Sequence, residues 1–360
     1  MLGTKTNAEE IELFLRHCLE SNEKAMINGK RKTPVCIWGV HGIGKTELVE
    51  RFARQNDYEF AYIAPAQFEE MGDLIGMPKV KDGKTIFAPP SWVPTRDKKG
   101  ILLLDDINRA DDRILRGLMQ LLQNYELTSW TLPASWDIVL TANPDDGDYS
   151  VTPMDDAMLT RMRHITLTFD AKVWAKWATQ NHIDARGINF VLTYPELITG
   201  QRTTPRSLVQ FFESIGEIKD LKSNLTLVQL LGDATLDEAT VAAFIAYVNQ
   251  DLAELITPET ILETTDFQFE VYYPLERMIL QETLRVDILN TVCTRLLQYA
   301  ALQSNLTNLQ LENIKSFIQL SFLPNDIRLA FAQDLITSDH PQLKMLVSDP
   351  VIGKILLEGV

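Results

Sequence analysis

Eight residues near the start of the chain have the types and the order that bind phosphate. Glycines let backbone N–H groups turn towards phosphate oxygens, and the N-terminus of a following helix adds partial positive charge. In such a loop the lysine ammonium reaches the β- and γ-phosphates, and the threonine hydroxyl binds Mg²⁺. A histidine inside the loop is expected to be a spacer. The residues are Gly39, Val40, His41, Gly42, Ile43, Gly44, Lys45 and Thr46.

The segments on either side of this loop support a nucleotide site. The apolar run Val-Cys-Ile-Trp at 35–38 predicts a buried strand, and Glu-Leu-Val-Glu-Arg-Phe at 47–52 predicts the start of a helix. A strand, a glycine-rich loop and a helix in this order form the context that a phosphate-binding P-loop requires. The spacing of the loop occurs by chance in long chains, but rarely with both neighbours in place.

A second apolar run ends in two carboxylates. Residues 101–104 (Ile-Leu-Leu-Leu) predict a buried strand, and Asp105 and Asp106 follow it. At the carboxyl end of a parallel strand beside the P-loop, Asp105 is placed to hold Mg²⁺ through water, and Asp106 to orient an attacking water. Many strands end in acids, so the carboxylates indicate nucleotide hydrolysis only in combination with the loop.

Two further polar residues lie where a group that senses the bound phosphate is needed. Asn143 terminates the expected strand that contains the apolar run 138–140. Arg206 follows Pro205 at the expected start of a helix. Asn143 also fits a turn residue before Pro144, and Arg206 also fits a surface arginine. The residue types alone therefore leave both roles open.

Apolar runs separated by helical or loop segments predict a parallel sheet covered on both faces. An amphipathic helix is expected from about residue 7 to 28, before the first buried strand. The Asp82-Gly83 pair predicts a β-hairpin at 80–87. Residues 127–133 predict a second insertion, in which Pro133 permits only an edge strand or a turn. The expected sheet strands lie at 35–38, 60–63, 101–104, 138–140 and 165–167.

After residue 169 the apolar periodicity becomes helical. We therefore predict an α/β fold in which a nucleotide-binding core (1–169) with a parallel sheet and hairpin insertions precedes two helical parts. These are a small helical unit (170–232) and a C-terminal helical extension (233–360). Because no low-complexity linker separates them, the final helices are expected to be docked rather than tethered.

Composition narrows the function classes. The 360 residues include 49 acidic and 34 basic side chains, a net charge of −15, which argues against a surface built mainly to hold nucleic acid. No apolar stretch is long enough to span a membrane, and the first ten residues lack the features of a signal peptide. Three scattered cysteines (Cys18, Cys36 and Cys293) indicate reduced thiols and a cytoplasmic location rather than disulfides or a zinc site.

The motifs in this order resemble those of an AAA+ ATPase. The segments that carry the resemblance are the P-loop, Leu-Leu-Leu-Asp-Asp-Ile-Asn-Arg-Ala at 102–110, Thr-Ala-Asn-Pro at 141–144, Met-Leu-Thr-Arg at 158–161 and Thr-Pro-Arg at 204–206. More narrowly, Asp-Ile-Asn-Arg-Ala and the Asp-Leu-Ile-Gly at 73–76 before a hairpin resemble the MoxR and dynein-related branch. Segments 174–183 and 323–331 are similar to lid and C-terminal segments of its bacterial members.

The resemblance implies a set of roles and the cofactors ATP and Mg²⁺. Lys45 and Thr46 match the Walker A residues, Asp105 matches the magnesium-associated Walker B acid, and Asn143 and Arg206 match sensors 1 and 2. Segment 170–232 would be the lid that carries sensor 2. The hairpin at 80–87 and the insertion at 127–133 would be the helix-2 and pre-sensor-1 insertions, which face the ring pore in relatives.

The resemblance also implies an assembly and a partner. Arg161 matches the arginine finger that enters the neighbouring subunit's site, with Arg163 as a nearby alternative. A finger implies a homo-oligomeric ring, most often a hexamer. Bacterial members are often encoded beside proteins with a von Willebrand factor A-like domain, so a partner of this class is expected.

The family usually has glutamate where this chain has Asp106. Aspartate is one methylene shorter, and a misplacement of about 1 Å can cost roughly a hundredfold in rate. The leading hypothesis is a chaperone-like ATPase that remodels a protein partner. One alternative is an ATP-gated scaffold with little hydrolysis. The other is a nucleic-acid motor, which the net negative charge of the chain argues against.

Overall fold

The computed structural model describes residues 2–144, 151–198, 202–249, 256–279, 286–338 and 340–358. It divides into two compact units, Met1–Asp170 and Ala171–Val360. The first unit is an α/β structure and the second is helical, as the sequence predicts. The further boundary that we predict within the second unit, between residues 232 and 233, stays a prediction.

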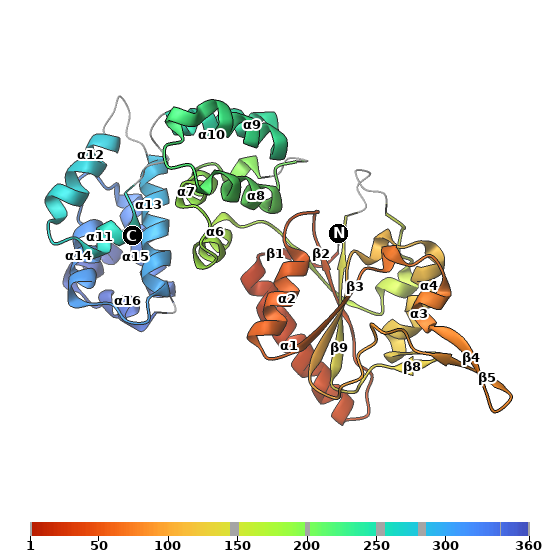
Figure 1. Ribbon diagram of the computed structural model, residues 1–360. Helices are drawn as coiled ribbons and strands as arrows, with labels where there is room; N and C mark the ends of the chain where they lie inside the picture. Colours follow the sequence, from red (N-terminus) through yellow and green to blue (C-terminus); the bar gives the residue numbers. More distant parts are fainter. Residues whose placement is uncertain are drawn as a thin grey trace. The chain divides into compact units, whose positions relative to one another are not determined.

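A six-stranded sheet forms the centre of the first unit (Figure 1). The strand order is β1-β10-β2-β9-β6-β3, and each pairing is parallel. All five sheet strands expected from the sequence are present. The sixth strand, β1, was not predicted because it is a short polar edge strand without an apolar pattern. The strands are β1 (Thr4–Thr6), β2 (Val35–Trp38), β3 (Glu59–Ile63), β6 (Gly100–Leu104), β9 (Trp136–Ala142) and β10 (Arg163–Leu167).

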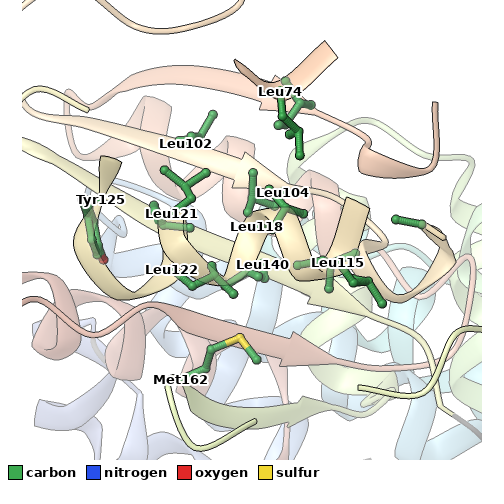
Figure 2. Packing of buried hydrophobic residues seen from close by; sticks show 14 of the residues in the cluster. Leu74, Leu102, Leu104, Leu115, Leu118, Leu121, Leu122, Tyr125, Leu140 and Met162 are labelled. Atoms are coloured by element: carbon green, nitrogen blue, oxygen red, sulfur yellow. The ribbon is translucent and has the colours of Figure 1, made fainter. Parts of the chain in front are cut away.

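Helices cover both faces of the sheet. Because successive residues of a strand point to opposite faces, each central strand contributes to two cores. Val35 and Ile37 of β2 share a core with α1 and α2, whereas Cys36 and Trp38 share a core with α3 and α4. Figure 2 shows leucines of α4 in this second core with Leu102, Leu104 and Leu140 from the strands. The helices of this unit are α1 (Ala8–Ile27), α2 (Lys45–Gln55), α3 (Met71–Ile75), α4 (Asp112–Asn124) and α5 (Asp156–Leu159).

Both predicted insertions are antiparallel hairpins. The first pairs β4 (Met77–Lys81) with β5 (Lys84–Ala88), and its turn residues Asp82 and Gly83 have φ values of 51° and 70°. This left-handed geometry is the one that an Asp-Gly turn favours. The second pairs β7 (Glu126–Leu127) with β8 (Trp130–Thr131). Trp130 is buried, and its ring meets that of Trp92 edge-on at a centroid distance of 5.3 Å.

The second unit packs its helices around α13, which contacts α6 and α7 on one side and α11 and α15 on others. Two polar contacts join α7 to α13: Thr193 and Thr291 hydroxyls lie 3.2 Å apart, and Arg295 donates to Asn189 at 2.8 Å. The helices are α6 (Ala171–Gln180), α7 (Ala185–Thr193), α8 (Pro205–Gly216), α9 (Leu225–Thr235), α10 (Glu238–Asn249), α11 (Pro258–Glu263), α12 (Tyr273–Ile279), α13 (Val286–Leu302), α14 (Asn308–Ile318), α15 (Asn325–Thr337), α16 (Pro341–Leu346) and α17 (Pro350–Glu358).

Within the described residues, no helix of either unit is both long enough and apolar enough to cross a membrane.

Candidate nucleotide site

The glycine-rich loop lies between the carboxyl end of β2 and the start of α2, as the sequence predicts. Gly44 caps α2 with a φ of 97°, a left-handed conformation that costs glycine little. The cap has no side chain of its own, so the N-terminal amides of α2 remain available to an anion. The loop therefore has the backbone geometry of a phosphate cradle.

Lys45 connects the loop to the neighbouring strand end. Its side chain is buried, with 6% exposed, and Nζ donates to the carbonyl oxygens of Gly39 and Val40 at 2.9 and 3.2 Å. It also donates to Asn143 Oδ1 at 3.0 Å and lies 3.9 Å from Asp106 Oδ1. Four other predicted site residues, Gly39, Val40, Asp106 and Asn143, thus converge on the Lys45 ammonium group.

Asp105, the predicted magnesium acid, accepts hydrogen bonds from three hydroxyl groups. Thr46 Oγ1 donates to Oδ1 at 2.8 Å, and Thr141 Oγ1 donates to the same oxygen at 2.6 Å. The Tyr62 phenol donates to Oδ2 at 3.2 Å. Burial, followed by the nearby Asp105 carboxylate, raises the pKa of Tyr62, so the phenol keeps the proton that it donates. Thr46 and Asp105, both predicted to face Mg²⁺, are in direct contact.

Asp106 sits at a sharp turn between β6 and a short 3₁₀ turn, Ile107–Arg109. Its φ of 47° is left-handed, an uncommon conformation for a residue other than glycine. Its N–H donates to Thr141 Oγ1 at 2.7 Å, and its Oδ2 lies 3.5 Å from Arg109 Nε. The carboxylate stands between Arg109 and Lys45, and 29% of its side chain is exposed.

Asn143 is fully buried at the end of β9. Its Oδ1 accepts from Lys45, while its Nδ2 has no hydrogen-bond partner among the described residues. Its backbone is bound on both sides by the Asn108 amide: Asn143 N–H donates to Asn108 Oδ1 at 3.0 Å, and Asn108 Nδ2 donates to Asn143 O at 2.8 Å.

The donor set fits a magnesium nucleotide. Mg²⁺ prefers hard oxygen ligands and keeps several waters when it binds phosphates, and Thr46 and Asp105 offer a hydroxyl and a carboxylate at one position. No cluster of three or more histidine, cysteine or acidic residues suited to a metal occurs in the described ranges. A buried amide N–H₂ without an acceptor is costly, and a phosphate oxygen or a water on Asn143 Nδ2 would satisfy it.

Two arginines were candidates for the residue that enters a neighbouring site. Arg161 follows α5, and its guanidinium donates to Gln123 Oε1 of α4 at 3.3 and 3.4 Å and to the Ala157 carbonyl. Arg163 begins β10 and donates to the Cys18 carbonyl of α1 at 3.2 Å. Arg163 therefore braces its own chain across the sheet face that α1 covers.

Arg206 belongs to the second unit and is exposed in the first turn of α8. Thr204 caps this helix in a reciprocal pair with Ser207, and Asp237 accepts from the Thr203 N–H at 2.9 Å. These contacts fix the start of α8. The role of Arg206 as a phosphate sensor stays a prediction, because the two units are described separately.

Three contributors to the site were not singled out from the sequence: Tyr62, Asn108 and Thr141. Thr141 directly follows the apolar run 138–140, and a polar residue in such a position is the signal that could have revealed it; the structure buries it fully. Asn108 lies inside the quoted Asp-Ile-Asn-Arg-Ala motif, but the motif alone does not say what its amide binds. Tyr62 gives no sequence signal beyond a strand tyrosine.

Residues 34–162, which span this site, match the AAA domain family, dynein-related subfamily. Over 189 residues the chain is 29% identical to Lon protease 2 of Borreliella burgdorferi. That match spans 45% of this chain and 23% of the protease, so less than a quarter of the relative's length is represented.

Solved structures of RuvB from Thermotoga maritima also align with the chain. A point mutant of that protein has a TM-score of 0.41 and 15% identity, and the structure described as a Holliday junction branch migration motor has a TM-score of 0.39 and 17% identity. Each alignment covers 85% of this chain and 94% of the other.

Proposed function

We propose, on the premise that residues 34–162 form an AAA domain like those of AAA+ ATPases, that the protein hydrolyses Mg-ATP to remodel a protein partner, as MoxR-like proteins do. The observation that carries the proposal is the convergence of Lys45, Asp106 and Asn143 beside the Thr46–Asp105 pair at the carboxyl ends of β2, β6 and β9. A structural ion pair alone would not need the glycine loop that adjoins it.

Each group has a chemical task in this proposal. The Lys45 ammonium exchanges its carbonyl partners for β- and γ-phosphate oxygens. Thr46 and Asp105 would hold Mg²⁺, which would supply positive charge to neutralise the charge that develops on the phosphates. Asp106 orients the attacking water, and its partial exposure leaves water access to the carboxylate. Asn143 Nδ2 donates to the γ-phosphate or to that water.

Asp106 decides between hydrolysis and an ATP-gated scaffold. The carboxylate already lies near Lys45, at 3.9 Å, and the left-handed turn at this residue aims a short side chain at the site. We therefore propose that Asp106 is competent, and we expect Asp106→Glu to give no gain in ATP turnover. A rise of about tenfold or more in the turnover of this variant would instead favour the scaffold.

We propose that Arg161 is an arginine finger that enters the site of the neighbouring subunit. Such a finger requires a ring of subunits, and a hexamer is the proposed size. Arg161 is proposed because it holds the finger position of the family pattern; it donates to Gln123 and to the Ala157 carbonyl just before it, whereas Arg163 donates to the Cys18 carbonyl of the distant helix α1. A finger supplied by a neighbour is worth about 10³–10⁵ in rate. ATP hydrolysis per subunit should therefore rise steeply with protein concentration as the ring assembles.

The test compares the ATPase rate of wild type, Arg161→Ala and Arg163→Ala over a range of protein concentrations. We expect Arg161→Ala to stay at the low rate of the dispersed protein at every concentration, while its ATP affinity is retained. Arg163→Ala should keep the concentration dependence and lose thermal stability. A wild type and Arg161→Ala with equal rates throughout would refute the finger.

The β4–β5 hairpin supports a protein as the partner. It extends from the body of the first unit (Figure 1), and Met77, Val80 and Ile86 are 70%, 82% and 43% exposed. The strand register puts Met77 and Ile86 on one face of the hairpin and Val80 on the other, so exposed apolar side chains on both faces are available to a protein partner. The proposed partner is a protein of the von Willebrand factor A-like class, bound through this hairpin.

The double substitution Met77→Ser and Val80→Ser tests this surface. It should abolish co-purification of that partner and leave the basal ATPase rate unchanged. Retained binding would exclude the hairpin.

A further inference from the structure

Asn108 is a buried residue whose side-chain amide donates one hydrogen bond to polypeptide backbone and accepts one from it. Only 2% of it is exposed. Its Oδ1 accepts from the Asn143 N–H at 3.0 Å, and its Nδ2 donates to the Asn143 carbonyl at 2.8 Å. These two contacts fix the orientation of the Asn108 amide, because only an oxygen accepts and only the NH₂ group donates. The main chain of Asn143 is thereby held at two points.

The side chain of Asn143 is oriented as a consequence. The Lys45 ammonium has no acceptor capacity, so the amide atom that faces it at 3.0 Å is Oδ1. Nδ2 then points away from Lys45, is buried, and lacks an acceptor within the described part of the chain. A donor held in this way is preorganised for an oxygen that arrives with a ligand.

The turn that carries Asn108 is itself fixed. The Asn108 carbonyl accepts from the Thr152 N–H at 2.7 Å, and the Ala110 carbonyl accepts from Thr152 Oγ1 at 2.7 Å. The same turn begins at Asp106, two residues earlier. Asn108 therefore connects the candidate water-orienting acid with the candidate phosphate sensor through a rigid segment.

We propose that Asn108 is a positioning residue that sets the distance and direction of the Asn143 side chain relative to the γ-phosphate. The inference rests on the proposed ATP site. It goes beyond that site because the two side-chain hydrogen bonds of Asn108 go to the main chain of Asn143, so Asn108 acts through Asn143. Loss of the amide lets the end of β9 relax, and displacements of about 1 Å in such groups cost up to roughly a hundredfold in rate.

The chain contains a matched control at the other end of the sheet. Asn22 is 1% exposed, accepts from the Thr33 N–H at 3.0 Å and donates to the Thr33 carbonyl at 3.0 Å. This is the same two-point clamp on a backbone, remote from the P-loop. It also donates to Asp137 at 2.8 Å, so its removal should cost at least as much stability.

The experiment measures kcat, KM and the affinities for ADP and for a slowly hydrolysed ATP analogue in wild type, Asn108→Ala and Asn22→Ala. For Asn108→Ala we expect kcat to fall about 10- to 100-fold and ADP affinity to change less than about threefold. Affinity for the ATP analogue should weaken about fivefold relative to ADP, the value of one lost hydrogen bond. Asn22→Ala should lose stability and keep both the rate and the affinity ratio.

Asn108→Asp covers the case in which the alanine variant does not fold. It keeps the acceptor for the Asn143 N–H and replaces the donor to the carbonyl by a carboxylate oxygen that repels it, so its ATP-to-ADP affinity ratio should change at least as much as that of alanine. A ratio unchanged in both Asn108 variants would overturn the inference even if wild type hydrolyses ATP. A wild type that binds the analogue but does not hydrolyse ATP would refute the proposed function, and the affinity ratio would still test the role of Asn108.

Discussion

The two ends of the central sheet each contain a buried lysine 3.9 Å from an aspartate oxygen. At the carboxyl end the pair is Lys45 and Asp106, and at the amino end it is Lys32 and Asp137. Both ends also contain an asparagine that clamps a backbone segment. The similarity of these parts makes the differences between the two ends informative.

The amino end is closed. Lys32 Nζ donates to the Ala134 and Trp136 carbonyls at 2.6 and 2.7 Å, and its ammonium lies 5.5 Å from the centre of the Tyr125 ring. The side chains of Lys32 and Asp137 are 9% and 7% exposed. Burial lowers the pKa of Lys32 and raises that of Asp137. This cluster ties α1 and its following loop to the start of β9.

The carboxyl end is open. Asp106 is 29% exposed and adopts a left-handed backbone, and Asn143 Nδ2 lacks a partner in the described ranges. Partial exposure, strain and an unused buried donor cost stability, and such features concentrate where a ligand is to be bound. The comparison indicates that the same charged pair stabilises the fold at one end and is available for chemistry at the other.

The largest expected effect is on kcat for ATP, when the same substitution is made at Asp106 and at Asp137. Asp106→Asn should lower kcat for ATP about 10²- to 10⁴-fold, the usual contribution of a positioned proton acceptor, with little change in ATP affinity. Asp137→Asn should leave kcat within about twofold of wild type, because the side chain is at the opposite end of the sheet. Steady-state ATPase assays measure both. Equal losses in the two variants would remove the functional distinction between the ends.

A stability effect should distinguish the amino end from the surface. Lys32→Met removes two hydrogen bonds and leaves the Asp137 carboxylate buried without its cation, so the free energy of unfolding should fall by about 3–5 kcal/mol. Lys99→Met is the control, because Lys99 and Glu23 form an exposed pair at 2.9 Å worth about 0–1 kcal/mol. Chemical denaturation provides both values. A Lys32 variant as stable as the Lys99 variant would contradict the structural role.

The smallest effect is a pH dependence. Burial raises the pKa of Asp137 in the folded state, so the folded protein holds this proton more tightly than the unfolded chain does. The stability that this carboxyl contributes is therefore greatest at low pH and is lost as pH rises from about 4, its ordinary value. The free energy of unfolding of wild type, relative to that of Asp137→Asn, should therefore fall as pH rises from about 4. A difference that is constant or grows with pH would contradict the assignment.

Local signals in the sequence were sufficient for much of the fold. The Asp82-Gly83 turn gave the first hairpin because its left-handed geometry depends on two adjacent residues. The glycine loop and the apolar run before it predicted, in the same way, the strand, loop and helix that the structure contains; the binding of a nucleotide there stays a prediction. The edge strand β1 escaped notice because three polar residues carry no periodic pattern.

The supporting contacts of the site could not be predicted, because they join distant segments. Thr141 meets Asp105 across 36 positions, and Asn108 meets Asn143 across 35. At the amino end Asn22 meets Asp137 across 115. Sequence spacing says nothing about such pairs until strand order is known, and the order β2-β9-β6 is what brings the P-loop, Asn143 and Asp105 to one edge.

We propose that the carboxyl end of the sheet binds the phosphates of Mg-ATP through Lys45. The decisive experiment is an equilibrium titration of wild type, Lys45→Ala and Lys32→Ala with a fluorescent ATP analogue in the presence of Mg²⁺. We expect saturable binding by wild type, retention by Lys32→Ala wherever that variant is folded, and a loss of about 10- to 100-fold in Lys45→Ala, the value of a hydrogen bond to a charged group. Wild-type and Lys45→Ala proteins with the same affinity, or a wild type that binds no analogue, would contradict it.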